Sequence, residues 1–180
     1  MVKTINQLHK LGIRNTVMMT GDSYRTAEAI AKQVGVDQFY AEVLPEDKAN
    51  FVQKEKAAGH TVVMIGDGIN DSPALSAADV GIAINSGAAI AREIADVTIK
   101  ADSLEELVFL KTVANALQHR VSANYRFVLS FNSTLILLGA LGILQPAASA
   151  MLHNLSTLGI SLKSMTNLVQ TPSSLPQIAK

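Results

Sequence analysis

The first hundred residues alternate between short apolar runs and stretches with helical spacing. The apolar runs are residues 15–19, 38–43, 61–65, 80–84 and 97–99. In the stretch that follows Ser23 and ends at Gly35, apolar residues recur every three or four positions, at Ala27, Ile30, Ala31 and Val34. Strands that alternate with helices at this spacing predict an α/β fold with a parallel sheet covered on both faces.

Two longer apolar segments follow. Residues 127–144 contain 18 residues without a charge, and residues 147–169 contain 23 with a single charge, Lys163. Lengths near 20 predict two membrane spans, separated by the break at Pro146. Arg120 and Arg126 precede the first segment, so the positive-inside rule places residues 1–126 and the C-terminal tail in the cytoplasm. The alternative is a buried helical hairpin in a soluble protein.

The chain therefore divides into four predicted parts. Residues 1–102 form the α/β part, and residues 103–126 form a long helix that continues directly into the apolar region. Residues 127–170 form the two-helix transmembrane hairpin, and residues 171–180, with two prolines, form a flexible tail. We expect the membrane lipid bilayer to be one partner.

The amino-acid composition limits which kinds of site and partner this chain can have. The chain has no cysteine, which excludes disulfides and thiolate metal sites. Fifteen basic residues balance fifteen acidic ones, and the basic residues are scattered, so we expect no nucleic-acid partner. The mean hydropathy of +0.25 is high for a soluble domain, and the apolar excess lies in the second half.

The run from Gly66 to Asp71 contains the strongest candidate chemistry. Asp67 and Asp71 lie four residues apart in a glycine-rich turn, directly after an apolar strand. Magnesium prefers carboxylate oxygens together with water and phosphate oxygens, and Asn70 can fix the turn or a phosphate oxygen. The sequence predicts a magnesium–phosphate site here, rather than a plain solvated turn.

Two further segments can serve the same site. Thr20, Gly21 and Asp22 follow another predicted strand, and the Thr20 hydroxyl could donate to a phosphoryl oxygen. Lys48 lies in the first turn of a predicted helix and could supply the fixed cation that phosphoryl transfer requires. Each segment also has a simpler reading, as a helix cap or as a surface lysine.

These motifs together resemble a known family. The segments TGD, PEDK and GDGINDSPALSAADVGIAI are similar, in order and spacing, to the second half of the phosphorylation domain of heavy-metal-translocating P-type ATPases, in the haloacid dehalogenase superfamily. The resemblance implies that Thr20 and Lys48 contact a phosphoryl group from ATP. It also implies that Asp67 binds Mg²⁺, that Asp71 supports it and that Asp22 orders the loop.

The sequence also departs from that family. Members carry the nucleophilic aspartate in a DKTGT motif, but no Asp-Lys-Thr run occurs here. A nucleotide-binding segment and the earlier membrane helices have no counterpart either. The chain is therefore expected to represent a C-terminal portion, with an incomplete Rossmann-like sheet whose open edge reduces solubility.

The second half carries another polar cluster. Met151, His153, Asn154 and Thr157 lie within two helical turns, and Asn132 lies in the preceding apolar segment. Such a set could bind a transported transition-metal ion. The alternative is that these side chains only join neighbouring helices by hydrogen bonds.

We therefore predict part of a P-type ATPase that couples ATP hydrolysis, through an aspartyl phosphate, to transition-metal transport, with this chain inactive alone. One alternative is a non-catalytic, membrane-anchored remnant that binds magnesium, phosphate or metal, or a split-pump subunit whose partner is the missing N-terminal part. A self-contained phosphatase would need an aspartate before Arg14, and none occurs there.

Overall fold

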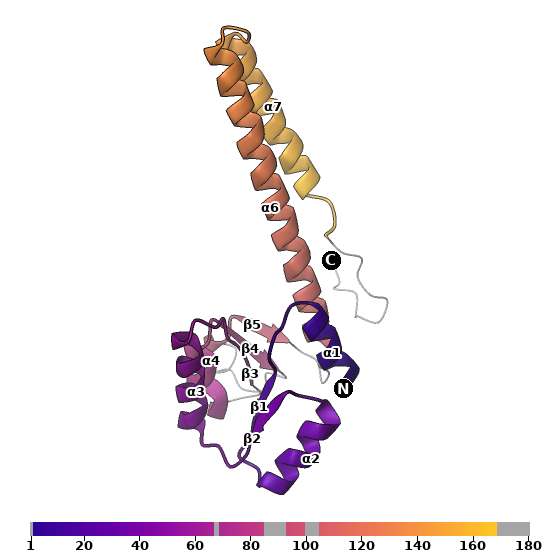
Figure 1. The fold of residues 1–180 in the computed structure, drawn as a ribbon, viewed down its shortest axis with the longest axis vertical. Helices are drawn as coiled ribbons and strands as arrows, with labels where there is room; N and C mark the ends of the chain where they lie inside the picture. The colour runs from indigo at the N-terminus through magenta and orange to yellow at the C-terminus, as the bar shows by residue number, and fades with distance from the viewer. Residues whose placement is uncertain (1, 67–68, 85–92, 100–104, 169–180) are drawn as a thin grey trace. The chain divides into compact units, whose positions relative to one another are not determined.

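The computed structural model describes residues 2–66, 69–84, 93–99 and 105–168 (Figure 1). They fall into two compact units, Met1–Phe109 and Leu110–Lys180, which we call the α/β unit and the helical unit.

The α/β unit alternates helices and strands as predicted. Its elements, in chain order, are α1 (Val2–Lys10), β1 (Val17–Met19), α2 (Tyr24–Val34), β2 (Gln38–Tyr40), α3 (Pro45–Ala57), β3 (Val63–Gly66), the 3-10 turn η1 (Ile69–Asp71), α4 (Ser72–Ala77), β4 (Val80–Ile84) and β5 (Val97–Ile99). Gly35 ends α2 with φ of 80°, a conformation that glycine adopts without strain. Pro45 begins α3 at a position where its missing N–H is not needed.

The strands form two separate parallel sheets. β1 pairs with β2, and β3, β4 and β5 form a second sheet in that order. Within the described residues, no strand pairs with β1 on its other edge or with the free edge of β3. The incomplete parallel sheet that the sequence predicts is thus present as two smaller parallel sheets.

The core lies on one face of β3. Met64 packs with Val52 of α3 and with Ala74 and Leu75 of α4, and α3 and α4 contact each other (Figure 1). Because strand side chains alternate in direction, the opposite face presents Val63 and Ile65, whose exposures are 43% and 37%. The prediction that this strand is buried on both faces is therefore wrong, since α3 and α4 cover only one of them.

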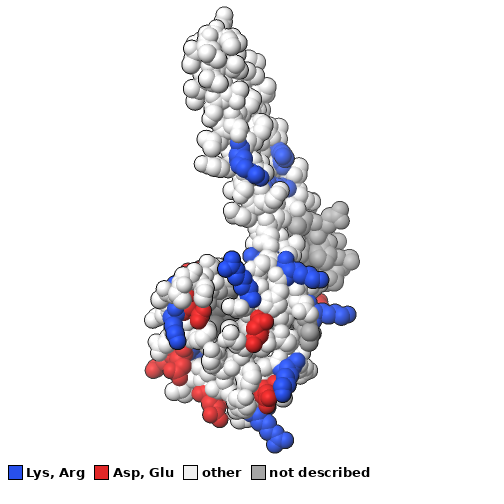
Figure 2. All heavy atoms as spheres, in the orientation of Figure 1, with Lys and Arg blue, Asp and Glu red and all other residues white. Residues whose placement is uncertain are grey.

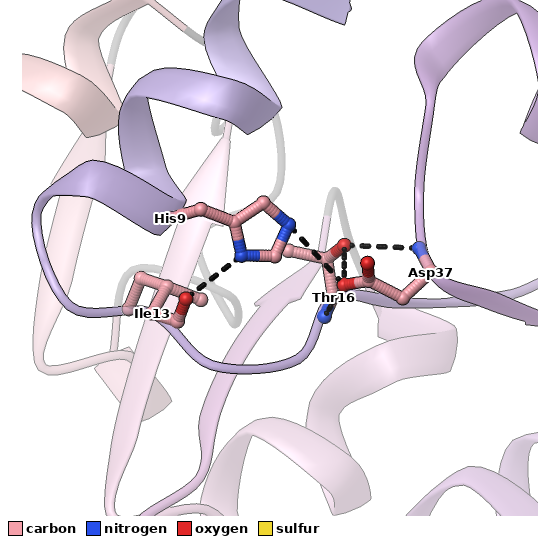
Figure 3. Close-up of polar contacts among 4 residues, drawn as sticks. All are labelled: His9, Ile13, Thr16 and Asp37. Atoms are coloured by element: carbon pink, nitrogen blue, oxygen red, sulfur yellow. Dashed lines mark hydrogen bonds and ion pairs between the residues drawn. The ribbon is translucent and has the colours of Figure 1, made fainter.

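A polar cluster joins α1 to the starts of β1 and β2. Figure 3 shows the Asp37 carboxylate accepting hydrogen bonds of 2.7 Å from both the backbone N–H and the hydroxyl of Thr16, while His9 lies 3.3 Å away. The second ring nitrogen of His9 contacts the carbonyl oxygen of Ile13 at 2.8 Å. These hydrogen bonds from Thr16, together with nearby His9, lower the pKa of Asp37.

The helical unit consists mainly of α6 (Glu105–Ala140), from Leu110 onward, and α7 (Pro146–Ser164). The long helix predicted to run on into the apolar region is confirmed as α6. Asn132 on α6 contacts His153 on α7, and Arg120 on α6 donates to the carbonyl of Ser164, so the two helices run side by side (Figure 1).

Neither helix has the length and hydropathy that a membrane crossing requires, and the same holds for the other helices in the described ranges. The prediction of two membrane spans is therefore corrected. α6 ends at Ala140, because the chain turns at Gly142 with φ of 70°, so residues 141–144 do not extend the apolar helix. α7 contains polar His153, Asn154 and Lys163 among its apolar residues.

Candidate functional site

An open pocket of about 380 Å³ lies where β1 and β3 end. Its lining combines residues from both sheets, the loop after β1, α3 and η1: Met19, Thr20, Gly21, Lys48, Ile65, Gly66, Asp71 and Ile84. The carboxyl ends of parallel strands are where α/β folds bind ligands. Four of the predicted site residues, Thr20, Gly21, Lys48 and Asp71, therefore meet in one pocket.

The centre of the pocket is an ion pair. Lys48 Nζ, from the first turn of α3, donates to Asp71 Oδ1 at 2.7 Å, and the two side chains are only 15% and 11% exposed. Removing two charges from water is costly, and close pairing offsets that cost. Asp71 also precedes α4, whose N-terminus favours a negative charge. The pair thus places one cation and one carboxylate at fixed positions.

Gly66 keeps room for that carboxylate. A Cβ atom added at Gly66 would lie 2.6 Å from Asp71 Cβ and 2.9 Å from Asp71 Oδ2. Real Cβ contacts are not this short, so any larger residue would displace Asp71. Glycine at this position is therefore a requirement of the site geometry.

The loop after β1 is fixed by hydrogen bonds. Thr20 Oγ1 donates to Asp22 Oδ2 at 2.8 Å, and the Asp22 N–H donates back to Thr20 Oγ1 at 3.2 Å. Backbone N–H groups of Val43 and Glu42 donate to the carbonyls of Thr20 and Asp22. A threonine hydroxyl has one proton, so a phosphoryl oxygen would compete with Asp22 for it.

Glu42, in the segment that holds this loop, adopts φ of 55°, an unfavourable conformation for a residue with a Cβ atom. Its N–H group donates to the Asp22 carbonyl at 2.9 Å. The loop that carries Thr20 is thus held in part by a locally strained residue.

Other predicted residues have different positions. Asp67 lies outside the described residues. Asn70 is exposed in η1 and does not line the pocket. Ser72 was not predicted, yet its hydroxyl, next to Asp71, is buried without a hydrogen-bond partner in the described part of the chain. A serine at the start of a helix gives no sequence signal for this, since it is a common helix cap.

The second predicted cluster is only partly assembled. His153 Nδ1 contacts Asn132 Oδ1 at 2.9 Å, so these two polar residues from different helices do meet. The Thr157 hydroxyl donates to the His153 carbonyl at 3.0 Å. Met151 is 71% exposed, and Asn154 is exposed as well. Across the described residues, no three His, Asp or Glu side chains gather as a metal site would require.

Comparison with known proteins identifies relatives of this chain. Residues 1–79 match the family described as Hydrolase: haloacid dehalogenase-like hydrolase. The chain is 38% identical over 159 residues to the zinc-exporting P-type ATPase of Mycobacterium marinum, covering 88% of this chain and 22% of that protein. It is 41% identical over 166 residues to the probable copper-importing P-type ATPase A of Enterococcus hirae, covering 91% and 23%.

A solved structure supports the same relationship. The crystal structure of a zinc-transporting PIB-type ATPase in the E2.Pi state matches with a TM-score of 0.83 and 32% identity, over 91% of this chain and 27% of that one. The chain is homologous to the heavy-metal P-type ATPases. The resemblance inferred from the TGD, PEDK and GDGIND motifs is confirmed.

The homology covers only part of these ATPases. The chain spans 22% of the mycobacterial P-type ATPase and 23% of the enterococcal one. These relatives are named for different metals, zinc and copper.

Proposed function

We propose that this chain supplies part of the phosphoryl-transfer site of a P-type ATPase, which couples ATP hydrolysis, through an aspartyl phosphate, to transition-metal transport across a membrane. The observation that supports this most is the gathering of Thr20, Gly21, Lys48 and Asp71 in one pocket at the strand ends. In this proposal, residues 1–102 form part of the phosphorylation domain and residues 103–126 its stalk, both in the cytoplasm.

Two side chains would bind the transferred group directly. Lys48 would provide a fixed positive charge for the phosphoryl oxygens, since its ammonium group already lines the pocket. Thr20 would donate its hydroxyl proton to another phosphoryl oxygen after giving up its hydrogen bond to Asp22. Asp22 would then keep the loop in place through its backbone hydrogen bond from Glu42.

The donor set fits Mg²⁺. Asp71 presents a carboxylate in an open pocket large enough for an ion with several waters, and only its Oδ1 atom is paired with Lys48. Asp71, and Asp67 from the same turn, would hold the ion. When bound, Mg²⁺ would neutralise charge on the phosphoryl oxygens. Lys48 would meanwhile keep the Asp71 carboxylate oriented.

The nucleophile would enter between the two sheets. β1 and β3 each have a free edge within the described residues, and the pocket is lined by residues from the ends of both strands. A parallel strand between them would satisfy both edges and present the residue at its carboxyl end to Thr20 and Lys48. A DKTGT segment would place its aspartate there.

The test is phosphoenzyme formation. This chain alone, with labelled ATP and Mg²⁺, should form no acid-stable, hydroxylamine-labile adduct. Mixed with a polypeptide carrying the DKTGT strand and a nucleotide-binding domain of a relative, it should support one, and Lys48→Ala should abolish it. An adduct on the isolated chain would contradict the proposal, as would a mixture in which Lys48→Ala has no effect.

The free strand edges also favour a second candidate, a split-pump subunit without activity of its own. Unpaired backbone groups at a sheet edge readily recruit another strand. In this case the chain and a separately encoded front half should co-purify and restore turnover only together. If the chain remains a monomer that binds Mg²⁺ or phosphate without such a partner, a non-catalytic binding protein is favoured.

We further propose that His153 contributes to the transport site. Asn132 Oδ1 can accept only from Nδ1–H of His153, and this contact would leave Nε2 to bind a metal ion. Met151, Asn154 and Thr157 are the remaining candidate ligands. Calorimetric titration with Zn²⁺, Mn²⁺ and Cu⁺ should show binding that His153→Ala removes and Asn132→Ala weakens, whereas retention of binding in His153→Ala would exclude the site.

A further inference from the structure

Acidic and basic residues are distributed unevenly along the sequence of this chain. All 15 acidic residues lie at or before Glu106. The basic residues after that point are Lys111, Arg120, Arg126, Lys163 and Lys180. The helical unit therefore carries only positive side-chain charges, and the face shown in Figure 2 has Lys and Arg among uncharged residues there.

Three side chains of the helical unit that are or can be positively charged line one pocket: His119, Arg120 and Lys163. A cavity of about 360 Å³ lies between α6 and the end of α7, with His119, Arg120 and Asn124 on one side and Lys163 on the other. The rest of its lining is small or apolar: Ala116, Ala123 and Leu168. The lining residues include no acidic side chain, so the pocket favours an anion.

Arg120 and Asn124 are held in place. The Arg120 guanidinium donates to the carbonyls of Ser164, Thr166 and Asn167, at 3.1, 2.6 and 3.0 Å, and so closes the end of α7. The Asn124 amide donates to the Ser164 hydroxyl at 3.0 Å. These contacts are structural, and they give the pocket a defined shape.

His119 and Lys163 differ from Arg120 and Asn124 in the contacts of their side chains. Within residues 105–168 and the other described ranges, neither side chain has a hydrogen bond or ion pair, and both are exposed. An ammonium group and an imidazole without acidic partners can donate to the oxygens of one incoming group. The pocket thus combines a fixed guanidinium with two available donors.

Apolar side chains adjoin this pocket. Phe127 and Val128 lie one helical turn beyond Asn124, on the same side of α6, and are 51% and 39% exposed. Further along, Ile136 and Leu137 are 73% and 59% exposed, and Leu162 next to Lys163 is 60% exposed. Exposed apolar surface of this extent on two neighbouring helices fits a partner with hydrocarbon chains.

We propose that this pocket binds the phosphate group of an anionic phospholipid, with the acyl chains along the exposed apolar side chains of α6. Lys163 and His119 donate to the phosphate oxygens, and Arg120 supplies a fixed charge beside them. A zwitterionic lipid binds less well, because its own cation approaches three basic residues. This site is separate from the proposed phosphoryl-transfer pocket and does not depend on it.

The experiment is calorimetric titration of the full chain, in a neutral detergent, with short-chain phosphatidylglycerol. Lys163→Gln should weaken binding about tenfold, as expected for loss of a charge-assisted hydrogen bond, and His119→Gln should weaken it several-fold. Arg126→Gln is the matched control, since it removes one positive charge from α6 outside the pocket and should change affinity less than twofold. Circular dichroism confirms that each variant keeps its helices.

Three results would overturn the proposal. Equal weakening by Lys163→Gln and Arg126→Gln would show general charge attraction rather than a site. Equal binding of short-chain phosphatidylcholine would show that hydrocarbon contact alone is responsible. Displacement by inorganic phosphate at the same concentration as the lipid would identify a free-anion site instead of a lipid site.

Discussion

The two units of this molecule use their apolar residues in opposite ways. In the α/β unit, Val52 and Leu75 are 1% and 2% exposed and form a core around β3. In the described part of the helical unit, Leu135 is the one buried apolar residue, and α7 has none. The α/β unit therefore contains its own source of stability, whereas the helical unit depends on what surrounds it.

The same difference between the two units determines which of them can hold charged side chains in fixed positions. A buried ion pair such as Lys48–Asp71 needs a packed core to exclude water and hold both side chains. The contacts of the helical unit, such as those of Arg120 and His153, involve exposed groups. The proposed phosphoryl site can thus be organised before any ligand arrives, whereas the exposed side chains of the sites proposed on α6 and α7 would be fixed only when a ligand binds.

The largest expected effect is in the core. Leu75→Ala removes a fully buried side chain and should lower the free energy of unfolding of the α/β unit by about 2–5 kcal/mol. Leu155→Ala on α7, where the side chain is 60% exposed, should change it by less than about 0.5 kcal/mol. Hydrogen exchange of the β3 and β4 amides measures both. If Leu75→Ala and Leu155→Ala lowered the free energy of unfolding by similar amounts, the proposed difference between the two units would be wrong.

The next effect concerns the ion pair. Lys48→Ala leaves the Asp71 carboxylate largely buried and unpaired, and should cost about 2–4 kcal/mol, somewhat below the range for a fully buried pair. Lys32→Ala is the control, because Lys32 is exposed and pairs with a Glu28 side chain that is 39% exposed, so it should leave the stability almost unchanged. Urea unfolding measures the difference. If the two variants lose the same amount, the pair does not organise the site.

A smaller effect is expected at Glu42, which is strained within the loop that holds Thr20. Glu42→Gly should stabilise the α/β unit by about 0.5 kcal/mol, since relief of the positive φ outweighs the greater flexibility of glycine in the unfolded chain. Glu46→Gly in the first turn of α3 should instead destabilise it by about 0.5–1 kcal/mol. Thermal unfolding of both variants tests whether the sign differs.

The smallest effect is on pH dependence. Hydrogen bonds from Thr16 lower the pKa of Asp37, and a hydrogen bond from the Val62 N–H lowers that of Asp79, so both carboxylates stabilise the folded state above their ordinary pKa near 3.8. That contribution is lost as the pH falls below about 4 through the lowered values. Asp37→Asn should flatten this decline in the α/β unit.

The helical unit provides an internal control for the pH prediction, because it has no Asp or Glu side chain. The hydrogen-exchange protection of its α6 and α7 amides should stay constant between pH 5 and about pH 3, measured alongside the protection of the α/β unit. Parallel losses in both units would show that they unfold together.

Much of the α/β unit could be predicted from sequence. Apolar runs gave the strand positions, and β4 and β5 were predicted at their observed bounds. The motifs at Thr20 and Asp71 predicted that these residues meet, because strand ends of a parallel sheet lie at one edge, and both residues line one pocket. The Lys48–Asp71 contact joins residues 23 positions apart on different elements, so only tertiary packing reveals it.

The largest difference between the sequence prediction and the structure lies in the long apolar segment of the second half. Residues 127–144 were expected to form one continuous span, but the helix ends at Ala140 and the chain turns at Gly142. A hydropathy pattern counts apolar residues and does not register where a glycine adopts positive φ. The exposure of Val63 and Ile65 was also missed, because an apolar run does not show whether one or two faces are covered.

The separation of charge along the sequence has a consequence for handling the protein. A formal net charge of zero suggests weak electrostatic forces between molecules. Yet residues up to Glu106 carry all the acidic side chains, and the basic residues beyond them have no acidic neighbours in sequence. Molecules of this kind attract one another through unlike regions, and dissolved ions screen that attraction. Moderate salt should therefore dissolve the protein better than dilute buffer does.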